Sequence, residues 1–381
     1  MNTGLVHSMR GGVAAPDWAR LAPADLAPVL RGVGVDPDGA VLEWHSARPL
    51  SSAGIVKVGG VRLFIKRHDQ RVRRVADLEE EHGFMRHLRA HGIPVSRVLA
   101  SAAGHSAIAA GSWTYEVHEL GRGVDAYREA QSWTPFASSA HAFTAGAALA
   151  DLHGAASSYR APPRSAQILV SNDRLIGATD PIAGLTDELP RRPALGAYLD
   201  ARSWRTDLAQ ALAPFHPRYR RGSARLARIW THNDWHASNL LWSGADSGAH
   251  VAGIIDFGLC DCTTRSYDLA TAIERNTIPW LDIQEGRGGS ADLALVTALL
   301  AGYRERAALS KQECASLVAI LPLVHWGYAL SEIEYFQGVT GSAENADLAY
   351  DAFLLGHCRW FTQPEGELVL RHLETTLSAA P

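Results

Sequence analysis

The sequence predicts an α+β protein in which a small antiparallel sheet is followed by a larger, mainly helical part. Short alternating strand patterns are confined to about the first 120 residues, and helical patterns dominate after Val124. A predicted hairpin over residues 239–255 carries an acidic group at each open end. With 381 residues, the chain is long enough for two lobes around a large buried core.

Composition limits the classes of function. Hydrophobic residues make up 47% and charged residues 20%, as in soluble globular proteins, and the net charge of −4 gives no general attraction to nucleic acid. No apolar run is long enough to span a bilayer, and the first 20 residues lack the apolar core of a signal peptide. We therefore expect a cytoplasmic protein, monomeric or homodimeric, with no nucleic-acid or membrane partner. Met9 is a possible alternative start.

The cysteines show no pattern of a metal site. Cys260 and Cys262 form a C-x-C pair without the two-residue spacing common at zinc sites, and no second ligand pair accompanies them. We expect these two residues, together with Cys314 and Cys358, to be reduced thiols.

The N-terminal region begins with an extension, residues 1–40, in which Pro23 and Pro28 interrupt one or two short helices. Gly59-Gly60 marks a hairpin turn between two strands. A helix with apolar residues near helical spacing is expected over residues 76–91. Strands are expected at 41–46, 54–58, 61–67, 98–103, 106–110 and 113–120.

The helical part begins with an alanine-rich segment that ends in Leu149-Ala-Asp-Leu-His153. Pro322 is expected to bend a later helix. The arginine-rich segment 216–228 is interpreted as solvated, because no aromatic stacking platform accompanies it. Helices are expected at 138–153, 187–214, 291–303, 312–337, 345–361 and 367–377.

Residues 229–258 carry the most informative pattern. His232, Asp234 and Asn239 are spaced H-x-D-x-x-x-x-N, and Asp256-Phe-Gly follows an apolar strand across a Gly/Ser/Asp turn. Phosphoryl transfer from ATP needs a carboxylate at the attacking hydroxyl and oxygen ligands for Mg²⁺. Asp234 can act as the base, and Asn239 and Asp256 can hold the metal. A hairpin with capping aspartates is the alternative, which the presence of both halves disfavours.

These residues resemble the catalytic loop and D-F-G of protein kinases, and the sequence H-N-D-W-H-A-S-N is more similar to the aminoglycoside phosphotransferase and choline kinase family. The resemblance implies a bilobal protein-kinase-like fold. An N-terminal nucleotide-binding lobe, residues 1–120, would contain one key helix, and a helical C-terminal lobe, residues 121–381, would contain the catalytic loop and acceptor pocket. It also implies ATP or GTP and Mg²⁺ as cofactors.

The same resemblance assigns nucleotide-binding residues. Lys66, at the end of a strand, would pair with a glutamate on the following helix, and the family pattern favours Glu81 over its two glutamate neighbours. A lysine that lies at a sheet edge with its ammonium group in water is the alternative. The preceding loop lacks the glycine triplet of protein kinases, but Ser51 and Ser52 can bind phosphate, although an ordinary loop is at least equally consistent with this sequence.

Other assignments concern the adenine site and the support of the catalytic loop. The strand that contains His118 and Leu120 resembles the hinge, where adenine bonds to backbone. His232 and Asp268 would support the catalytic loop, with Asp268 accepting backbone N–H bonds from it. A simple helix N-cap at Asp268 is the alternative.

The acceptor pocket is the least defined part of the prediction. Asn233 and Trp235 depart from the commoner H-G-D wording, so the family's substrates do not transfer to this chain. The acceptor would be a small molecule with a hydroxyl group, such as an aminoglycoside, amino sugar, cyclitol or amino alcohol, in antibiotic resistance or in metabolism. A solvated helix face is the alternative for the helical candidates. The candidate residues are Trp235, His236, His325, Tyr328, Glu332 and Tyr335.

A different class of function also fits part of this pattern. A catalytically silent, kinase-like module would bind nucleotide for regulation without transferring phosphate. Such a module would not need Lys66, Asp234, Asn239 and Asp256 together, so we favour the kinase.

Overall fold

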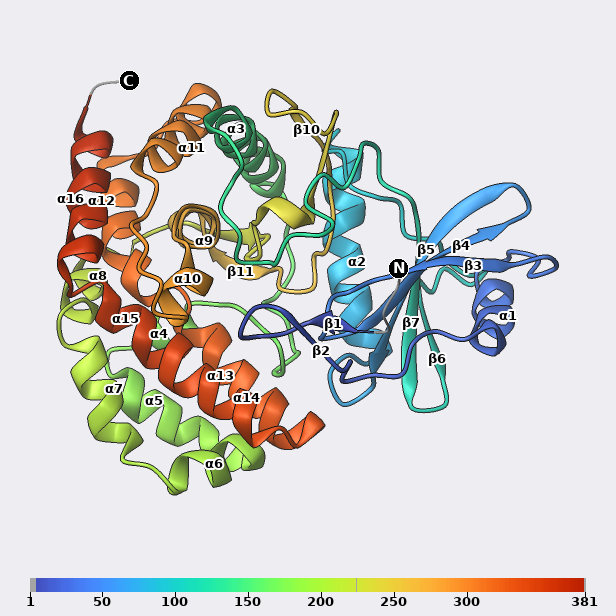
Figure 1. Cartoon of the computed structure of the whole chain (residues 1–381), viewed down its shortest axis with the longest axis horizontal. Coiled ribbons are helices and arrows are strands. Elements are labelled where there is room, and N and C mark those ends of the chain that lie inside the picture. Colours follow the sequence, from blue (N-terminus) through green and yellow to red (C-terminus); the bar gives the residue numbers. More distant parts are fainter. Residues whose placement is uncertain (1–4, 224, 380–381) are drawn as a thin grey trace.

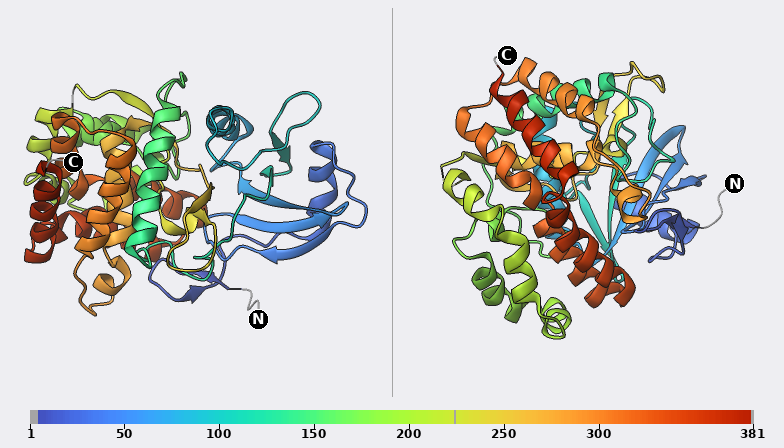
Figure 2. Two further views of the ribbon diagram at one scale, coloured as in Figure 1. Left: turned by 90° about the horizontal axis from the view of Figure 1, so that it is seen from above. Right: turned by 60° about the vertical axis from the view of Figure 1, so that its left-hand side comes forward.

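The protein is described by a computed structural model that covers residues 5–223 and 225–379. A small lobe built on a β-sheet lies beside a larger, mainly helical lobe (Figure 1), and Figure 2 shows the same division from above. The predicted α+β class is confirmed. The sheet ends at Glu119, next to the predicted boundary, but the functional division into domains stays a prediction. Residues 1–4 of the predicted extension lie outside the described residues.

Within the described residues, the small lobe has five antiparallel strands in the spatial order β3-β4-β5-β7-β6. Gly59 and Gly60 join β4 to β5 with φ angles of 55° and 81°. A type I′ turn requires positive φ at both central residues, which explains the two glycines. The elements are α1 (Pro23–Gly32), β3 (Val41–His45), β4 (Ser52–Val58), β5 (Val61–Asp69), α2 (Val75–Ala90), β6 (Ala107–Ala110) and β7 (Trp113–Glu119).

The alternation of side chains along β5 and β7 gives the sheet two different faces. Ile65 and Val117 are register partners on the face covered by α1, where they belong to the small lobe's hydrophobic core. Lys66 and Glu116 are the next pair and point to the opposite face, toward α2. The sheet therefore has an apolar core on one side and charged residues on the side of the cleft.

Two predictions about the small lobe are wrong. The segment 98–103, as the structure describes it, forms no strand, and Val98 makes only an isolated bridge to His118. Helix α1 continues through Pro28 and is not interrupted there, and the N-terminal extension also contains an unpredicted two-stranded hairpin, β1 (Val6–His7) with β2 (Val13–Ala14). These strands are too short to produce a periodic pattern in the sequence.

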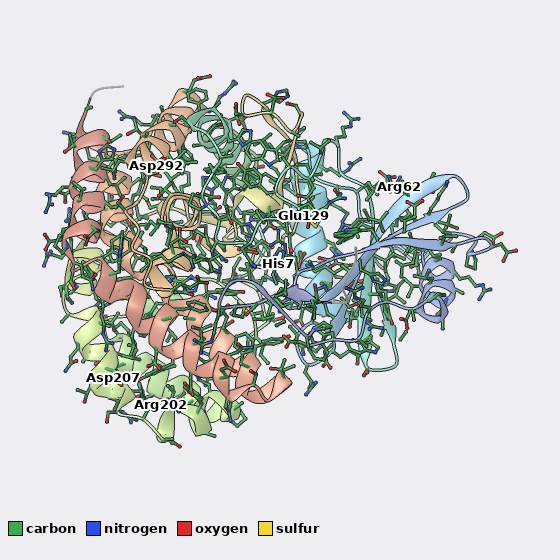
Figure 3. The ribbon with its side chains drawn as sticks, viewed as in Figure 1. His7, Arg62, Glu129, Arg202, Asp207 and Asp292 are labelled. Carbon is green, nitrogen blue, oxygen red and sulfur yellow. The ribbon has the colours of Figure 1, made fainter. Side chains whose placement is uncertain are left out.

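Residues 5–18, which we call the N-terminal bridge, contact both lobes. The backbone N–H of His7 donates to the carbonyl oxygen of Ala47 in the small lobe at 2.8 Å. Trp18 Nε1 donates to the hydroxyl of Tyr335 in the large lobe at 2.9 Å. Figure 3 shows the labelled His7 at the junction of the two lobes.

The large lobe contains a close helix crossing between α3 and α11. A Cβ atom on Gly146 would collide with the backbone oxygen of Leu299, and one on Gly302 would collide with that of Phe143. Glycine at both positions therefore allows the two backbones to touch. The helices are α3 (Ser139–Ala156), α4 (Arg174–Gly177), α5 (Pro181–Glu188), α6 (Pro193–Asp200), α7 (Trp204–Leu212), α8 (His216–Ser223), α9 (Arg265–Thr277), α10 (Trp280–Gln284), α11 (Leu293–Arg306), α12 (Lys311–Ile320), α13 (Trp326–Tyr335), α14 (Ala343–Leu348), α15 (His357–Trp360) and α16 (Pro364–Ser378).

Two short antiparallel strand pairs position the central residues of the large lobe. The predicted hairpin of residues 239–255 is present, because β9 pairs with β10 in the expected region. The other pair, β8 with β11, was not predicted, and its two strands lie before and after the β9–β10 hairpin in the sequence. The strands are β8 (Arg228–Thr231) with β11 (Asp261–Thr264), and β9 (Leu240–Trp242) with β10 (Val251–Ile254).

The predicted helix over 187–214 is wrong. Three helices, α5, α6 and α7, replace it. Pro190 and Pro193 account for the break between α5 and α6, because they cannot donate the hydrogen bonds of a continuous helix. The predicted bend at Pro322 is confirmed, since α12 ends at Ile320 and α13 begins at Trp326.

The stretch Lys311–Thr340, which includes α12 and α13, is long and apolar enough to cross a membrane by length and composition. However, 83% of its most apolar window is buried inside the protein. Leu317, Ile320 and Ile333 have no exposed surface and belong to the hydrophobic core of the large lobe. The stretch therefore forms core helices in this fold.

Candidate active site

The backbone is left-handed at two polar residues of the predicted catalytic region. Asn233 has a φ angle of 60° and Asp256 one of 57°. This region is unfavourable for most residues, and Gly, Asn and Asp tolerate it best. The observation explains why Asn233 can stand where the resembled family more often has glycine. Strained backbone is often retained at functional sites, so both positions mark a candidate site.

Asp268 anchors the loop between β8 and β9. Its fully buried carboxylate accepts the backbone N–H groups of His232 at 2.9 Å and Asn233 at 2.8 Å. His153, the last residue of the L-x-x-L-H segment, lies 3.0 Å from the same carboxylate. The alternative of a helix N-cap is wrong, because α9 begins earlier and Thr264 caps it.

His232 connects the loop to the strand that leads into Asp256. Its Nε2 lies 3.1 Å from the carbonyl oxygen of Ile255, and its Nδ1 lies 3.3 Å from the backbone nitrogen of Asp234. A neutral ring with the proton on Nε2 satisfies both contacts, because Nε2 then donates and Nδ1 accepts. The ring also packs on Phe257, with centroids 4.7 Å apart. His232 thus fixes the distance between the two acidic residues of the site.

Asp234 is held by three neighbours. Arg275 donates to its carboxylate at 2.6 Å, and the Asn239 amide donates to its carboxylate at 2.9 Å and to its carbonyl oxygen at 3.0 Å. His236 Nε2 lies 3.6 Å away. Burial alone would raise the pKa of Asp234, but Arg275 and His236 hold this pKa well below its usual range. Asp234 is therefore ionised and fixed in one orientation.

Arg275 was not predicted from the sequence. It lies seven residues after Asp268 on α9, two helical turns along the same face, so both side chains reach the catalytic loop. Its guanidinium also lies 3.9 Å from the ring centroid of Trp133. The spacing from Asp268 is the signal that could have identified Arg275.

The expected ion pair between Lys66 and Glu81 is wrong for the described residues. Lys66 Nζ instead donates to Asp256 at 2.9 Å, and buried Glu81 lies 3.5 Å from Arg164. Arg164 comes from the loop after α3, so its approach could not be read from local sequence. Burial lowers the pKa of Lys66, but Asp256, Glu116 and Glu81 together raise it above its usual value. Glu81 therefore affects Lys66 through its charge rather than through direct contact.

Asp256 stays ionised beside Lys66. Burial raises its pKa, but the charge of Lys66 and the hydrogen bond from Lys66 together lower the pKa overall. The carboxylate lies in a cavity between the lobes that eight of the seventeen predicted site residues line. Those lining it are Ser51, Lys66, Asp234, His236, Asn239, Asp256, Tyr328 and Glu332.

Among the residues that the structure describes, several predicted site residues do not line this cavity. Trp235 is completely buried, and Tyr335 turns to Trp18 of the N-terminal bridge. His325 lies behind Trp133, with ring centroids 5.0 Å apart. None of these three residues lines the cavity that the described residues form, so their assignment to the acceptor pocket stays a prediction without support from the cavity. Ser52 is buried at the start of β4.

The hinge residues remain a prediction. The His118 side chain is bound to Glu116 at 2.7 Å, and Leu120 is exposed. Neither side chain lines the cavity within the part of the chain that the structure describes. Adenine would bind the backbone here, so side-chain positions do not test this prediction.

Arg48 is a second cavity residue that the sequence analysis did not assign. It belongs to the loop before β4, and its guanidinium donates to the carbonyl oxygen of Ala130 and to Ser132 Oγ, both at 3.0 Å. His7 of the N-terminal bridge lies 3.0 Å from the same group. Arg48 thus connects the loop of the small lobe to the large lobe beside Lys66 and Asp256.

Comparison with known proteins identifies the family. The model of the phosphotransferase enzyme family matches residues 54–309, which is more than half of the chain. The chain belongs to the phosphotransferase enzyme family. The resemblance expected from the catalytic loop is thereby confirmed. This family member is 28% identical to an uncharacterized protein of Deinococcus radiodurans over 278 residues, 71% of this chain and 70% of the relative.

Solved structures support the fold of this family member. A microcompartment-associated aminopropanol kinase matches with 19% identity and a TM-score of 0.56, covering 89% of this chain and 97% of that one. An amicoumacin kinase in complex with AMP-PNP and Ca²⁺ matches with 15% identity and a TM-score of 0.58, covering 88% and 93%. The predicted protein-kinase-like fold is confirmed by these similarities.

Proposed function

We propose that this phosphotransferase uses ATP and Mg²⁺ to phosphorylate a hydroxyl group of a small molecule. The observation that carries the proposal is the convergence of Lys66, Asp234, Asn239 and Asp256 in one interlobe cavity. A binding module would need no carboxylate fixed at the position of Asp234. The alternative of a catalytically silent module is therefore less well supported.

The donor set fits Mg²⁺, which prefers oxygen ligands. The Asn239 amide nitrogen is used by Asp234, which leaves the amide oxygen for a cation. Asp256 supplies an ionised carboxylate. When bound, the ion would neutralise phosphate charge beside these two residues. Lys66 would bind phosphate oxygens in exchange for its contact with Asp256.

Asp234 would align the acceptor hydroxyl for in-line attack. Its pKa is held below the usual range by Arg275, so it is a weak base before the reaction. In a loose phosphoryl-transfer transition state the hydroxyl becomes acidic only as its oxygen bonds to phosphorus. Asp234 would then accept the hydroxyl proton on a carboxylate oxygen, while the bond to the leaving phosphate oxygen breaks. Asp234 would thus contribute more by aligning the hydroxyl than by accepting its proton.

The acceptor side of the cavity supports an amine-bearing substrate. Tyr328 and Glu332 of α13 line it together with His236 and Trp133. Burial raises the pKa of Glu332 to about 8, which means that its carboxylate lacks a sufficient partner. An ammonium group could be that partner. Aminoglycosides, amino sugars, aminocyclitols and amino alcohols all combine such a group with hydroxyls, and the similarity to an aminopropanol kinase fits this choice.

The same proposal includes a cytoplasmic location and a role in either metabolism or antibiotic resistance. The four cysteines are free thiols in the structure, which supports a reducing compartment. A panel of the four acceptor classes would distinguish the two roles. Consumption of ATP with one class, under Mg²⁺, identifies the substrate.

Asp234→Asn and Asp256→Ala test the assignment of roles. Asp234→Asn should lower kcat at least ~10²-fold, because a fixed carboxylate is lost. It should leave Mg·ATP affinity nearly unchanged, as measured by calorimetry. Asp256→Ala should abolish Mg²⁺-dependent turnover. Asp200→Asn, on an exposed helix end, is the matched control and should behave as wild type.

Two outcomes would contradict these roles. Equal loss of ATP affinity and turnover in Asp234→Asn would make Asp234 a structural residue or a metal ligand. ATP binding without turnover on any acceptor in the panel would favour the silent module.

A further inference from the structure

A second polar cluster is buried in the large lobe. Glu274 of α9, His325 directly before α13 and His357 of α15 are 1%, 6% and 3% exposed. We call these three residues the helical-lobe cluster. They do not line the interlobe cavity in the part of the chain that the structure describes, so the proposed phosphoryl transfer does not use them.

The side chains converge without satisfying one another. His357 Nδ1 lies 2.8 Å and His325 Nδ1 3.7 Å from the same carboxylate oxygen of Glu274. Even so, both carboxylate oxygens of Glu274 and both ring nitrogens of His357 make no hydrogen bond to any described residue. A buried carboxylate whose imidazole neighbours are close but not aligned for hydrogen bonding is unfavourable. A further group between these side chains would satisfy it.

A cluster of the same composition in the small lobe provides the contrast. Glu116 accepts hydrogen bonds from His82 at 2.9 Å, His118 at 2.7 Å and His68 at 2.9 Å. Its polar atoms are satisfied by the protein itself. Three ligand atoms lie within 4.8 Å of one another in both clusters, so proximity alone does not distinguish them. The two clusters differ in their hydrogen bonds, which are made in the small lobe and missing in the helical-lobe cluster.

We propose that the helical-lobe cluster binds a divalent transition metal ion, Zn²⁺ by preference. Two imidazole nitrogens and one carboxylate oxygen are a common zinc ligand set. Ligand atoms 2.0–2.2 Å from a tetrahedral ion are roughly 3.3–3.6 Å apart. The observed separations of 2.8 Å and 3.7 Å bracket this range. Trp280 stacks on His357 at 3.7 Å with rings 9° apart, which holds the imidazole in place.

The ion would stabilise the wall behind the acceptor side of the cavity. Glu274 directly precedes Arg275, which holds Asp234. Trp133 contacts both Arg275 and His325. Loss of the ion should therefore loosen the positions of Arg275 and Trp133 without removing any cavity residue.

Metal analysis of the full-length protein tests the proposal. After dialysis against a chelator, Zn²⁺ would be titrated without nucleotide or Mg²⁺, using a chromophoric competitor. We expect one tightly bound Zn²⁺ per chain and a higher Tm. His357→Ala should weaken this binding by more than about 100-fold. His118→Ala, in the satisfied cluster, is the matched control and should retain it, as should Asp256→Ala at the proposed Mg²⁺ site.

Three results would overturn the inference. The first is the absence of tight Zn²⁺ binding to the folded wild type, and the second is binding that His118→Ala or Asp256→Ala removes. If His357→Ala fails to fold, X-ray absorption of the wild-type zinc complex decides instead. Two imidazole ligands are expected there, and sulfur ligands would be the third contradicting result. None of these measurements depends on phosphotransfer.

Discussion

At the scale of single residues, Arg275 has the largest effect on the proposed catalytic group. It donates to Asp234 at 2.6 Å and lowers the pKa of that carboxyl. Arg275→Met should therefore raise this pKa and move the acidic limb of the kcat/KM profile to higher pH. The carboxylate would also be less well oriented, so kcat should fall roughly 10-fold or more. The pH profile of the purified variant measures both effects.

The charge of Arg275 can be separated from its shape. Arg275→Lys keeps a cation and should retain an acidic limb closer to that of the wild type. If the limb does not move in Arg275→Met, while the Tm stays close to wild type, Arg275 does not control the ionisation of Asp234.

The sequence was most informative about residues whose roles depend on local spacing. Asn239 and Asp256 lie at the open end of one short hairpin and Asp234 lies five residues before Asn239, so their proximity follows from the strands and the loop. The partner of Glu81 could not be predicted in this way. Arg164 lies 83 positions away in the sequence and reaches Glu81 only after α2 and α3 have packed. The helical-lobe cluster was missed for the same reason, because its members come from three separate elements.

At the scale of elements, Glu116 ties β7 to α2 and β5. Glu116→Gln removes a buried charge that accepts three hydrogen bonds, so it should lower the free energy of unfolding by about 2–3 kcal/mol at neutral pH. The pKa of Glu116 is well below its usual 4.5 in the folded protein. This stabilisation is thus complete above pH 4.5 and is lost as the pH falls through the folded-state pKa. Denaturant unfolding of the wild type and of Glu116→Gln at several pH values measures this difference in stability.

A surface pair provides the control for this experiment. Glu79 lies 3.0 Å from His105, whose side chain is 66% exposed to solvent, while that of Glu79 is 34% exposed. Glu79→Gln should change stability by less than about 1 kcal/mol. An equally small effect of Glu116→Gln at neutral pH would mean that the three imidazoles do not stabilise the sheet against α2.

The crossing of α3 and α11 gives a second prediction at this scale. Gly302→Ala places a methyl group against the backbone of Phe143 and should destabilise the protein by about 1–3 kcal/mol. At Gly154 in α3 an added Cβ meets no atom within 4 Å, so Gly154→Ala should stabilise the protein slightly, since alanine favours helix. Thermal unfolding of the two variants compares the positions directly. Equal Tm changes would mean that the helices can move apart freely.

At the scale of the whole molecule, the general arrangement was predictable because it depends on where strand and helix periods occur. The details that failed depend on proline and on very short elements. Pro190 and Pro193 divided a helix that hydrophobic spacing alone would continue, and the two-residue strands β1 and β2 are too short for any period. The contacts of the N-terminal bridge with the large lobe were likewise not encoded in any local pattern.

Translation from Met9 would test the N-terminal bridge as a unit. That product lacks β1 and the contact of His7 with Arg48. We expect faster release of a fluorescent ADP analogue in stopped-flow measurements and a higher acceptor KM. The value of kcat should change little, since the proposed catalytic residues lie elsewhere. Removal of residues 1–4 alone leaves β1 intact and is the control. Unchanged release from the Met9 product would rule out a role for the bridge in ligand retention.

The N-terminal bridge has a kinetic consequence. Because its residues are bonded to both lobes, the two lobes cannot move apart unless contacts such as Trp18 to Tyr335 first break. Ligand exchange would then require local detachment of a short hairpin, an opening governed by its own small free energy rather than by global stability. The rate of product release would then depend on residues 5–18, which lie far in sequence from the residues proposed to transfer phosphate.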